Sequence, residues 1–371
     1  MDFQKTFNKY SSKLAIDLGM KNKVPSKSDY QNFIIIPCYN EYDYIFKTLN
    51  SINQQELKLL NQTLVVIVIN NSNIESQSIV SNNKRTYELL LQKKYKYEFV
   101  VLDCFSKNHS INHKKAGVGY ARKIGLDYSL RYIKNKFSLL CSLDADTIIA
   151  KDYLYLVNKT MSTNTNVCVV NFQHQKSNDP IIEKAIRKYE KKIKYIAKKI
   201  DSTGSPYGYV SMGSTIICNV ISYVACGGMS TKKATEDFYF LQALAKFTKV
   251  KKIKNKLVFP SSRSEQRVYL GTGYRIKEFQ ASGEFKNLLF SEESFQLLKH
   301  MLNILEKSYN KSFDLVLNTI DKKARLFLES KNLQKIWPQI NLNAKDSCQF
   351  KLFIHQWFDA LMIMQFLKKI N

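Results

Sequence analysis

Two aspartates separated by one residue, Asp144 and Asp146, directly follow an apolar run at residues 137–143. The run is long enough for a buried strand and too short for a typical helix. Ligands of open α/β sheets bind at the carboxyl ends of the strands, so we expect both carboxylates at a ligand site. Such oxygen ligands suit a Mg²⁺ or Mn²⁺ ion that also holds substrate phosphates. Alternatively, Asp146 only caps a helix that begins near Lys151.

A second acidic pair, Glu236 and Asp237, stands at the start of an apolar stretch at 238–247 that predicts a helix. Carboxylates are side chains that can take part in proton transfer. The alternative is that both acids only stabilise the helix N-terminus through its dipole. The two roles do not exclude each other, so both stay open.

Strands and helices alternate around these residues. The predicted strands follow the apolar runs at 33–37, 64–69, 99–102, 137–143, 167–172, 214–218 and 253–259. Helical spacing is present at 44–52, 87–91, 113–130, 181–200 and 238–247. Strands that alternate with helices of this length indicate βαβ units in an α/β fold with a mostly parallel sheet. From about residue 274 onward the pattern is helical, which predicts a C-terminal helical region.

The composition indicates a globular chain with a strong positive charge. Hydrophobic residues make up 44% and aromatic residues 12% of the chain, which is typical of a folded protein. Lys and Arg number 57 against 31 Asp and Glu, a net charge of +26 that favours an anionic partner such as nucleic acid, anionic lipid or a nucleotide. The chain is also rich in Lys, Asn and Ile together, and a compositional bias of the genome would produce the same charge.

Cysteine usage and hydropathy bear on the compartment. The seven cysteines are scattered, with no CxxC pair, so the sequence predicts neither a zinc site nor a disulfide framework. They are typical of reduced, buried thiols. The sequence has no stretch of about eighteen uncharged apolar residues, so it predicts no transmembrane helix. The N-terminus lacks the apolar core of a secretory signal. We therefore expect a cytoplasmic protein.

The motifs in their order resemble glycosyltransferase family 2. The resemblance rests on PCYNE at 37–41, INNS at 69–72, GVGYARKIG at 117–125, LDAD at 143–146 and TED at 235–237. It covers about residues 32–247. The segment at 260–273, PSSRSEQRVYLGTG, also resembles an element that follows the catalytic core in some relatives. The resemblance implies a Rossmann-like GT-A fold, a nucleotide-diphosphate sugar donor, a divalent metal with the DXD motif, and inversion at the anomeric carbon.

The resemblance also implies roles for single residues. Asp146 binds the Mn²⁺ or Mg²⁺ ion, Asp144 binds the metal or the ribose, Asp237 is the base, and Glu236 orients the acceptor or Asp237. The residues expected at the nucleotide sugar are Pro37, Tyr39, Glu41, Asn70, Asn71, Lys115, Arg122, Asp144, Arg263 and Arg267. Asn70 and Asn71 replace the aspartate that is usual in the family, which leaves the nucleotide open.

Several of these residues have an ordinary structural alternative. Tyr39 could instead be an ordinary core residue. Lys115 and Arg122 belong to a glycine-containing segment, which could instead be a loop that caps a helix. Arg263 and Arg267 fit a diphosphate clamp and fit surface salt bridges nearly as well. None of the five histidines has the spacing of a metal motif, so none is assigned as a ligand.

The expected organisation is an N-terminal arm at 1–30, a GT-A catalytic domain at 31–273 and a helical region at 274–371. The expected activity is metal-dependent transfer to an acceptor hydroxyl of a glycan or glycolipid, in surface glycan or glycolipid synthesis. The Lys-rich helix at 181–200 fits either a solvated face or a peripheral contact with anionic membrane at its inner face. The apolar end at 350–367 fits core packing, a dimer contact or a membrane surface.

Two rival functions come from different classes. A sugar-nucleotide pyrophosphorylase also combines such a sheet with metal carboxylates, but the segment PCYNEYDYIF at 37–46 lacks the glycine-rich loop typical of those enzymes. A non-enzymatic polyanion-binding protein would follow from the positive charge alone. Salt-dependent nucleic-acid binding without turnover of nucleotide sugars would favour it. If the protein is a glycosyltransferase, we expect no nucleic-acid partner.

Overall fold

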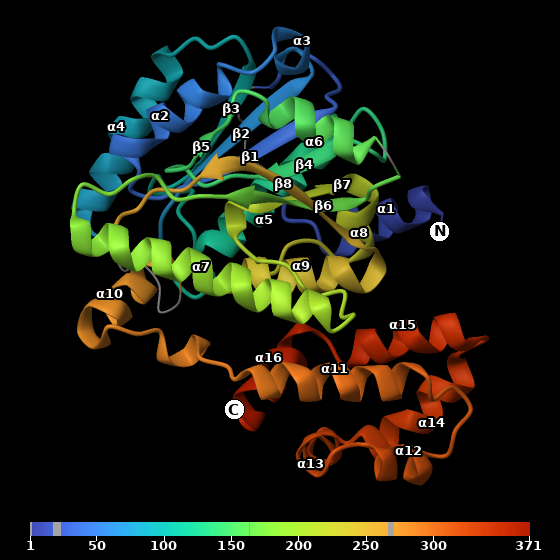
Figure 1. Ribbon diagram of the computed structural model, residues 1–371. Coiled ribbons are helices and arrows are strands. Elements are labelled where there is room, and N and C mark those ends of the chain that lie inside the picture. The colour runs from blue at the N-terminus through green and yellow to red at the C-terminus, as the bar shows by residue number, and fades with distance from the viewer. Residues whose placement is uncertain (1, 18–23, 163, 266–270) are drawn as a thin grey trace. The chain divides into compact units, whose positions relative to one another are not determined.

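The computed structural model describes residues 2–17, 24–162, 164–265 and 271–371. These residues form two compact units (Figure 1). The first consists of Met1–Ile186 and Ser211–Lys277, and the second of Arg187–Val210 and Glu278–Asn371. The segment 187–210, which we expected inside the catalytic domain, thus clusters with the C-terminal helices. The domain boundaries themselves stay a prediction.

The first unit is built on one mixed sheet. Its strands are β1 (Asn32–Cys38), β2 (Thr63–Asn70), β3 (Glu98–Cys104), β4 (Leu139–Ser142), β5 (Ile148–Ile149), β6 (Val167–Phe172), β7 (Ile216–Asn219) and β8 (Val250–Phe259). Their order is β3-β2-β1-β4-β7-β6-β8-β5. The strands β3, β2, β1 and β4 run parallel, whereas β7 is antiparallel to both of its neighbours. The predicted α/β fold is confirmed, and a second parallel pair is formed by β6 and β8.

The parallel strands form because their sequences are apolar without alternation. Every residue of β1 and of β2 is buried, as expected for a sheet that is covered on both faces. In register, Phe33 lies between Leu64 of β2 and Leu140 of β4. Pro37 pairs with Val68 of β2 but lies beyond the end of β4, so its missing N–H leaves no ladder bond unmade on that side. β1, β2 and β4 therefore end at one edge of the sheet.

Helices cover both faces of this sheet. In Figure 1, α2, α4 and α6 lie on one side and α5 and α9 on the other. The helices of this unit are α1 (Phe3–Lys13), α2 (Tyr42–Ile52), α3 (Leu57–Leu60), α4 (Gln77–Gln92), α5 (Val118–Ser129), α6 (Tyr153–Met161), α8 (Val220–Ala225) and α9 (Glu236–Phe247), with the 3₁₀ turns η1 (Leu130–Tyr132) and η2 (Gly213–Thr215). Two further helices, α7 (Pro180–Ser202) and α10 (Thr272–Ser282), begin in this unit and end in the other.

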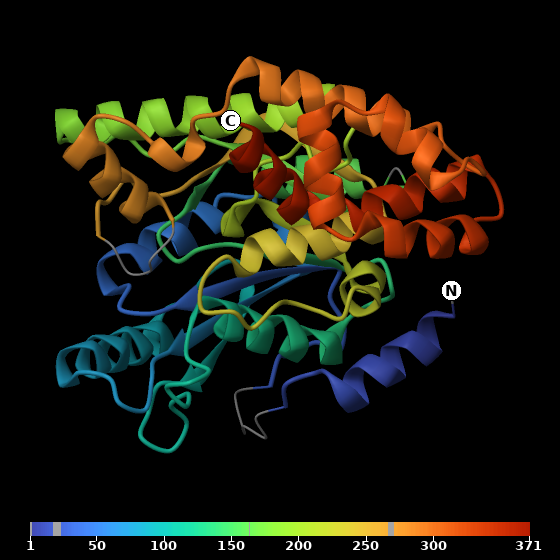
Figure 2. The same ribbon diagram turned by 90° about the horizontal axis from the view of Figure 1, so that it is seen from below.

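The N-terminal segment is tied to the first unit by a buried tyrosine. Tyr10 in α1 is 1% exposed, and its hydroxyl donates to Oδ1 of Asp127 in α5 at 2.7 Å. Lys123 donates to the same hydroxyl. Figure 2 shows α1 as a separate helix beside α5. Helix α1 therefore packs against α5 through buried hydrogen bonds, and leaving these polar groups unpaired in the core would cost free energy.

The second unit contains helices joined by turns and loops, and no strand among its described residues. It contains the end of α7, the turn η3 (Lys286–Leu288), and the helices α11 (Glu292–Glu306), α12 (Phe313–Thr319), α13 (Lys322–Ser330), α14 (Leu333–Asn343), α15 (Ser347–Trp357) and α16 (Ala360–Ile370). The predicted C-terminal helical region is confirmed. The apolar end at 350–367 supplies core residues of this unit, since Phe350, Phe358 and Phe366 are fully buried. Among the described helices, none combines the length and the apolar composition that a membrane span needs.

Candidate active site

The loops after β1 and β4 bring the expected acidic residues to the carboxyl edge of the sheet. Glu41 opens α2 just after β1, and Asp144 and Asp146 follow β4. The backbone N–H of Leu143 still bonds to Ile35 of β1 at 3.0 Å, which extends the pairing of the two strands to the acidic turn. Thr48 of α2 donates to the carbonyl oxygen of Ala145 at 2.7 Å and fixes the turn from the other side.

Asp144 is held by two donors from different parts of the chain. Its Oδ1 accepts from Nη2 of Arg122, and its Oδ2 accepts from the hydroxyl of Ser214 in η2. The side chain is still 33% exposed. Because each carboxylate oxygen has two lone pairs, Asp144 retains acceptor capacity toward the open side.

Arg122 joins Asp144 to the second acidic pair. Its Nη1 donates to Oε1 of Glu236, the first residue of α9, and the arginine side chain is 3% exposed. Burial lowers the pKa of Arg122, but the charges of Asp144 and Glu236 outweigh burial and raise it above its ordinary value. The guanidinium expected at the nucleotide is thus placed between two carboxylates of the protein.

Glu236 and Asp237 differ in their surroundings. Glu236 is 4% exposed, whereas Asp237 is half-buried and accepts from the backbone N–H of Phe238 at 2.7 Å. Burial raises the pKa of both carboxyls, and the charge of Arg122 opposes that rise. Thr235 directly before them has φ of 63°, a left-handed conformation uncommon for this residue type. Asp237 is therefore the member of the pair that is more accessible to a ligand.

Asp146 is paired with a second arginine. Nη2 of Arg263, in the loop after β8, lies 2.7 Å from Oδ2 of Asp146 and donates to Oε1 of Glu41 at 2.6 Å. Its guanidinium also stacks over the ring of Tyr44, with Cζ 4.4 Å from the ring centroid. Burial raises the pKa of Asp146, and Arg263 acts against it. Burial, with the charge of Asp146, raises the pKa of Glu41 to about 8.

The residues expected at the nucleotide base are partly committed to the fold. Asn71 is 1% exposed and donates to the carbonyl oxygens of Ser72 and Phe105, and it accepts from Asn83 of α4. Asn70 is 4% exposed, and its Oδ1 has no hydrogen-bond partner among the described residues. Asn71 thus holds the loop together, whereas Oδ1 of Asn70 is a buried acceptor without a partner among the described residues.

The remaining expected residues are distributed around this edge. Tyr39 is half-buried, and burial raises its pKa to about 12. Lys115 is exposed in the turn before α5. Arg267 lies outside the described residues. Sequence reasoning missed Ser214, Tyr44 and Asn83, because none of them belongs to a motif and only tertiary contacts bring them to the site.

The donor set fits a divalent ion that a substrate helps to hold. Asp144 and Asp146 supply the oxygen ligands that Mg²⁺ or Mn²⁺ prefers, and such ions are commonly bound by one or two carboxylates together with substrate phosphates. Among the described residues, no group of three or more His, Cys, Asp or Glu side chains is arranged to hold a metal by itself. The remaining ligands would have to come from phosphate oxygens and water.

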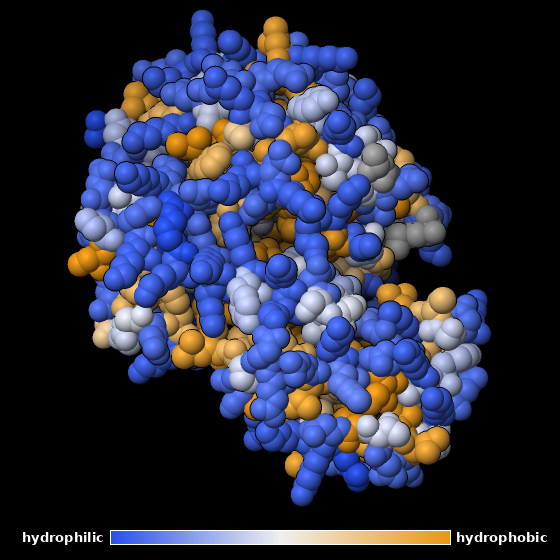
Figure 3. All heavy atoms as spheres, in the orientation of Figure 1, coloured by the Kyte–Doolittle hydropathy of each residue, from blue (hydrophilic) through white to orange (hydrophobic). Residues whose placement is uncertain are grey.

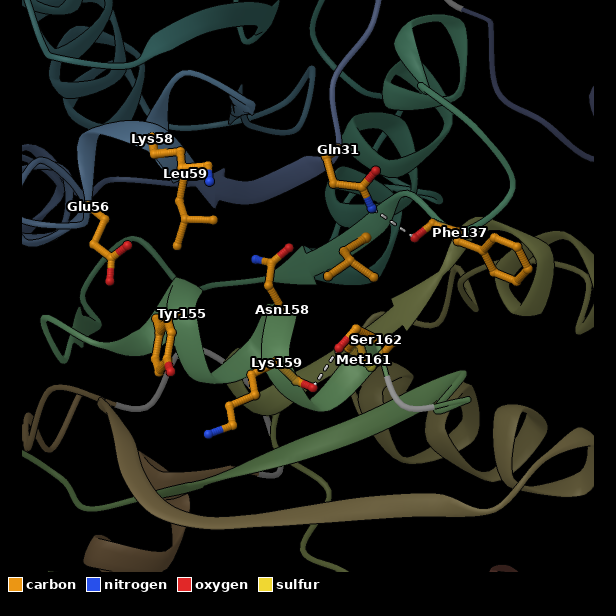
Figure 4. Close-up of a pocket in the computed structure, with 11 residues that line it drawn as sticks. Gln31, Glu56, Lys58, Leu59, Phe137, Tyr155, Asn158, Lys159, Met161 and Ser162 are labelled. Atoms are coloured by element: carbon orange, nitrogen blue, oxygen red, sulfur yellow. Dashed lines mark hydrogen bonds between the residues drawn. The ribbon is translucent and has the colours of Figure 1, made fainter.

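A cavity of about 490 Å³ lies away from these carboxylates (Figure 4). Gln31 and Leu139 in its wall stand at the amino ends of β1 and β4, the edge opposite to Asp144. Its other lining residues are Glu56, Lys58, Leu59, Phe137, Tyr155, Asn158, Lys159, Met161 and Ser162. The cavity therefore does not belong to the candidate active site.

Comparison with known proteins gives the class. Residues 33–214 match the family model described as glycosyl transferase family 2, which identifies the protein as a glycosyltransferase. The resemblance to this family that the sequence shows is confirmed over these residues. This range contains Glu41, Arg122, Asp144, Asp146 and Ser214, whereas Asp237 and Arg263 lie beyond it. No curated protein sequence matches the chain.

Several solved structures are similar at low identity. S. aureus TarS residues 1–349 in complex with UDP-GlcNAc is 14% identical, with 86% of this chain and 89% of that chain covered and a TM-score of 0.45. The mannosyltransferase PcManGT from Pyrobaculum calidifontis, in complex with GDP-Man and Mn²⁺, is 14% identical over 95% of both chains, with a TM-score of 0.41. Glucosyl-3-phosphoglycerate synthase from Mycobacterium tuberculosis in complex with UDP is 10% identical, with 67% of this chain and 78% of that chain covered and a TM-score of 0.37. At these values none of them says what this chain acts on.

Proposed function

We propose that the chain transfers a sugar from a nucleotide-diphosphate sugar to an acceptor hydroxyl of a glycan or glycolipid, with inversion at the anomeric carbon. The observation that carries this proposal is the link from Asp144 through Arg122 to Glu236. It joins one of the two potential metal ligands, Asp144, to the acidic pair at the start of α9. Donor-binding and proton-accepting groups of a displacement reaction have to lie close to one reacting carbon.

The residues have the following roles in this proposal. Asp146 and Asp144 would hold Mn²⁺ or Mg²⁺, and such an ion would supply positive charge to neutralise the leaving diphosphate. Arg263 turns from Asp146 to the diphosphate oxygens as the donor binds. Asp237 accepts the proton of the acceptor hydroxyl as its oxygen attacks the anomeric carbon from the face opposite to the leaving group. Direct displacement with one base gives inversion.

A donor panel tests this function. UDP-GlcNAc, UDP-glucose and GDP-mannose are added with and without Mn²⁺, and thermal unfolding and donor hydrolysis are measured. A donor at about a hundred times its dissociation constant should add about 2.7 kcal/mol to the free energy of unfolding. Metal-dependent stabilisation by one nucleotide class, together with release of its sugar, supports the proposal. Salt-dependent binding of nucleic acid, without stabilisation or hydrolysis by any donor, would favour the polyanion-binding alternative.

The exposed face of α7 supports a peripheral contact with anionic membrane, which would place the enzyme at a surface where glycolipid acceptors lie. Lys184, Lys188, Lys191 and Lys198 follow each other at spacings that keep them on one face, with exposed Tyr195 on the same stripe. None of the four forms an ion pair with a described residue. Figure 1 shows α7 as one long helix, and Figure 3, in the same view, shows mostly hydrophilic atoms over it.

Vesicle binding tests this contact. Changing the four stripe lysines to glutamine should weaken binding to vesicles that contain phosphatidylserine, since each basic residue near such a surface contributes about 1 kcal/mol. The matched control changes four exposed lysines outside α7, which are Lys58, Lys107, Lys134 and Lys151. Equal binding to neutral and anionic vesicles would contradict the contact.

A further inference from the structure

One guanidinium group connects the two halves of the candidate active site. Arg122 donates through Nη2 to Asp144 and through Nη1 to Glu236. Asp144 stands at the end of β4, and Glu236 begins α9, so the arginine on α5 fixes the distance between two elements that are far apart in the sequence. An arginine fork can hold two carboxylates in defined directions, whereas a lysine ammonium group is a point charge on a flexible stem.

Two glycines leave the space that this arrangement needs. A Cβ atom at Gly213 would lie 2.6 Å from both Cζ and Nη1 of Arg122. A Cβ atom at Gly119 would lie 2.6 Å from the carbonyl oxygen of Lys232 and 2.8 Å from Cβ of Glu236. The close packing of α5 against η2 and against the loop before α9 therefore depends on residues without side chains. Gly119 in α5 thus serves this packing.

We propose that Arg122 is a positioning residue that orients Asp144 toward the donor and the Glu236–Asp237 pair toward the acceptor through the same side chain. This inference rests on the proposed function. Arg122 is buried and both of its terminal nitrogens are already engaged by protein carboxylates. It therefore acts on the reaction through these carboxylates and does not touch the donor. Ser214 on Oδ2 of Asp144 completes the support on the donor side.

The role follows from the charges that meet at this place. Glu236 and Asp237 are adjacent acids, so without a nearby cation their mutual repulsion would favour protonation or displacement of one of them. A protonated Asp237 cannot accept a proton, and a displaced Asp237 is no longer aligned with the attacking hydroxyl. A misplacement of about 1 Å typically costs about a hundredfold in rate. Loss of the fork should therefore reduce turnover more than it weakens donor binding.

Substitutions at Arg122 and Gly213 test the proposal. Arg122→Lys keeps the positive charge but loses the guanidinium group that bonds to both carboxylates. Gly213→Ala keeps the guanidinium group of Arg122 but displaces it, because the added Cβ atom would clash with it. The backbone of Gly213 is outside the left-handed region, so alanine fits the chain there. The control is Arg131→Lys, in the exposed pair of Arg131 with Asp17. Turnover is measured as hydrolysis of the panel donor that the wild-type protein hydrolyses fastest, and affinity as the dissociation constant of that donor by calorimetry.

We expect both variants to lose about a hundredfold in turnover while the donor dissociation constant changes at least tenfold less. In an Arg122→Met background, Gly213→Ala should have little further effect, because its clash is with the missing guanidinium. Circular dichroism and thermal unfolding identify a variant that fails to fold. If one of the two single variants fails to fold, the other one tests the positioning role of Arg122. Wild-type turnover in Arg122→Lys, or a loss that is confined to donor affinity, would overturn the positioning role but leave the proposed function standing. A wild-type protein that hydrolyses no donor would overturn the proposed function itself.

Discussion

Nη2 of Arg263 lies 2.7 Å from Oδ2 of Asp146. A protein cation thus already neutralises the carboxylate that we assign to the metal, and a divalent ion has to compete with it for the same oxygens. Arg263 belongs to the loop after β8, so this loop and the acidic turn after β4 are coupled by charge. The first prediction concerns this competition.

Arg263→Gln should bind Mn²⁺ more tightly than the wild-type protein when no nucleotide is present. Removal of the competing guanidinium is expected to lower the Mn²⁺ dissociation constant by about tenfold, which corresponds to about 1.4 kcal/mol. Free Mn²⁺ is measured by electron paramagnetic resonance during a titration. Arg131→Gln, at an exposed ion pair, is the control. Weaker Mn²⁺ binding in Arg263→Gln would show that the arginine supports the metal site.

Asp146→Asn should abolish the metal-dependent part of donor stabilisation and leave the fold intact. The amide keeps the shape of the side chain but lacks the charge that a divalent ion requires. Thermal unfolding is compared with and without Mn²⁺ in the presence of the active donor. An unchanged Mn²⁺ response in this variant would place the metal elsewhere.

Asp237→Asn should bind donor and metal as the wild-type protein does, yet transfer sugar about a hundred- to ten-thousandfold more slowly. An amide cannot accept the proton of the attacking hydroxyl, so the effect falls on the chemical step. Donor dissociation constants and turnover are measured for this variant and for Asp152→Asn, an exposed acid at the start of α6. If Asp237→Asn retains wild-type turnover, the base is another group and the acidic pair only begins a helix.

Glu41 should make the metal-free protein less stable as the pH rises. Burial raises its pKa to about 8, whereas glutamate in an unfolded chain titrates near 4.3. Between these values the folded protein holds a proton that the unfolded chain has lost, so this contribution to stability is complete below about pH 4 and disappears as the pH passes about 8.

Glu41→Gln cannot ionise and should lose less stability across this range, by on the order of 1 kcal/mol or more. Urea unfolding is followed at about pH 5 and about pH 8 with a chelator present. The exposed Glu56→Gln is the control. An equal loss of stability in Glu41→Gln and in the wild-type protein would contradict a buried, protonated Glu41.

Tyr10→Phe should destabilise the first unit by about 1–3 kcal/mol, because it removes a buried hydroxyl and leaves its partners with fewer hydrogen bonds. The hydroxyl donates to Asp127 and accepts from Lys123. Urea unfolding of this variant is compared with that of Tyr155→Phe, a tyrosine that is 45% exposed. Equal stability of the two variants would mean that α1 is held by apolar packing alone.

Local sequence determined the strands and the ends at which chemistry gathers. Runs such as 33–37 and 64–69 are apolar without interruption, so they fold as strands buried on both faces, and polar residues that follow them have to emerge at the edge of the sheet. Asp144, Asp146 and Glu41 were located in this way, because a strand end is a local property of the chain. The two-residue strand β5 and the antiparallel position of β7 between β4 and β6 could not be predicted in this way, since they depend on pairing with distant strands.

Only the tertiary structure decided which charges meet. Arg122 carries no local signal that it pairs with Glu236, which is separated from it by 114 positions, and Arg263 pairs with Glu41 across 222 positions. The sequence identified both arginines as cations and assigned them to the nucleotide. Contacts between segments so far apart are set by how α5, α9 and the loop after β8 pack around the sheet, and ion pairs form only between side chains that this packing brings within a few ångströms of each other.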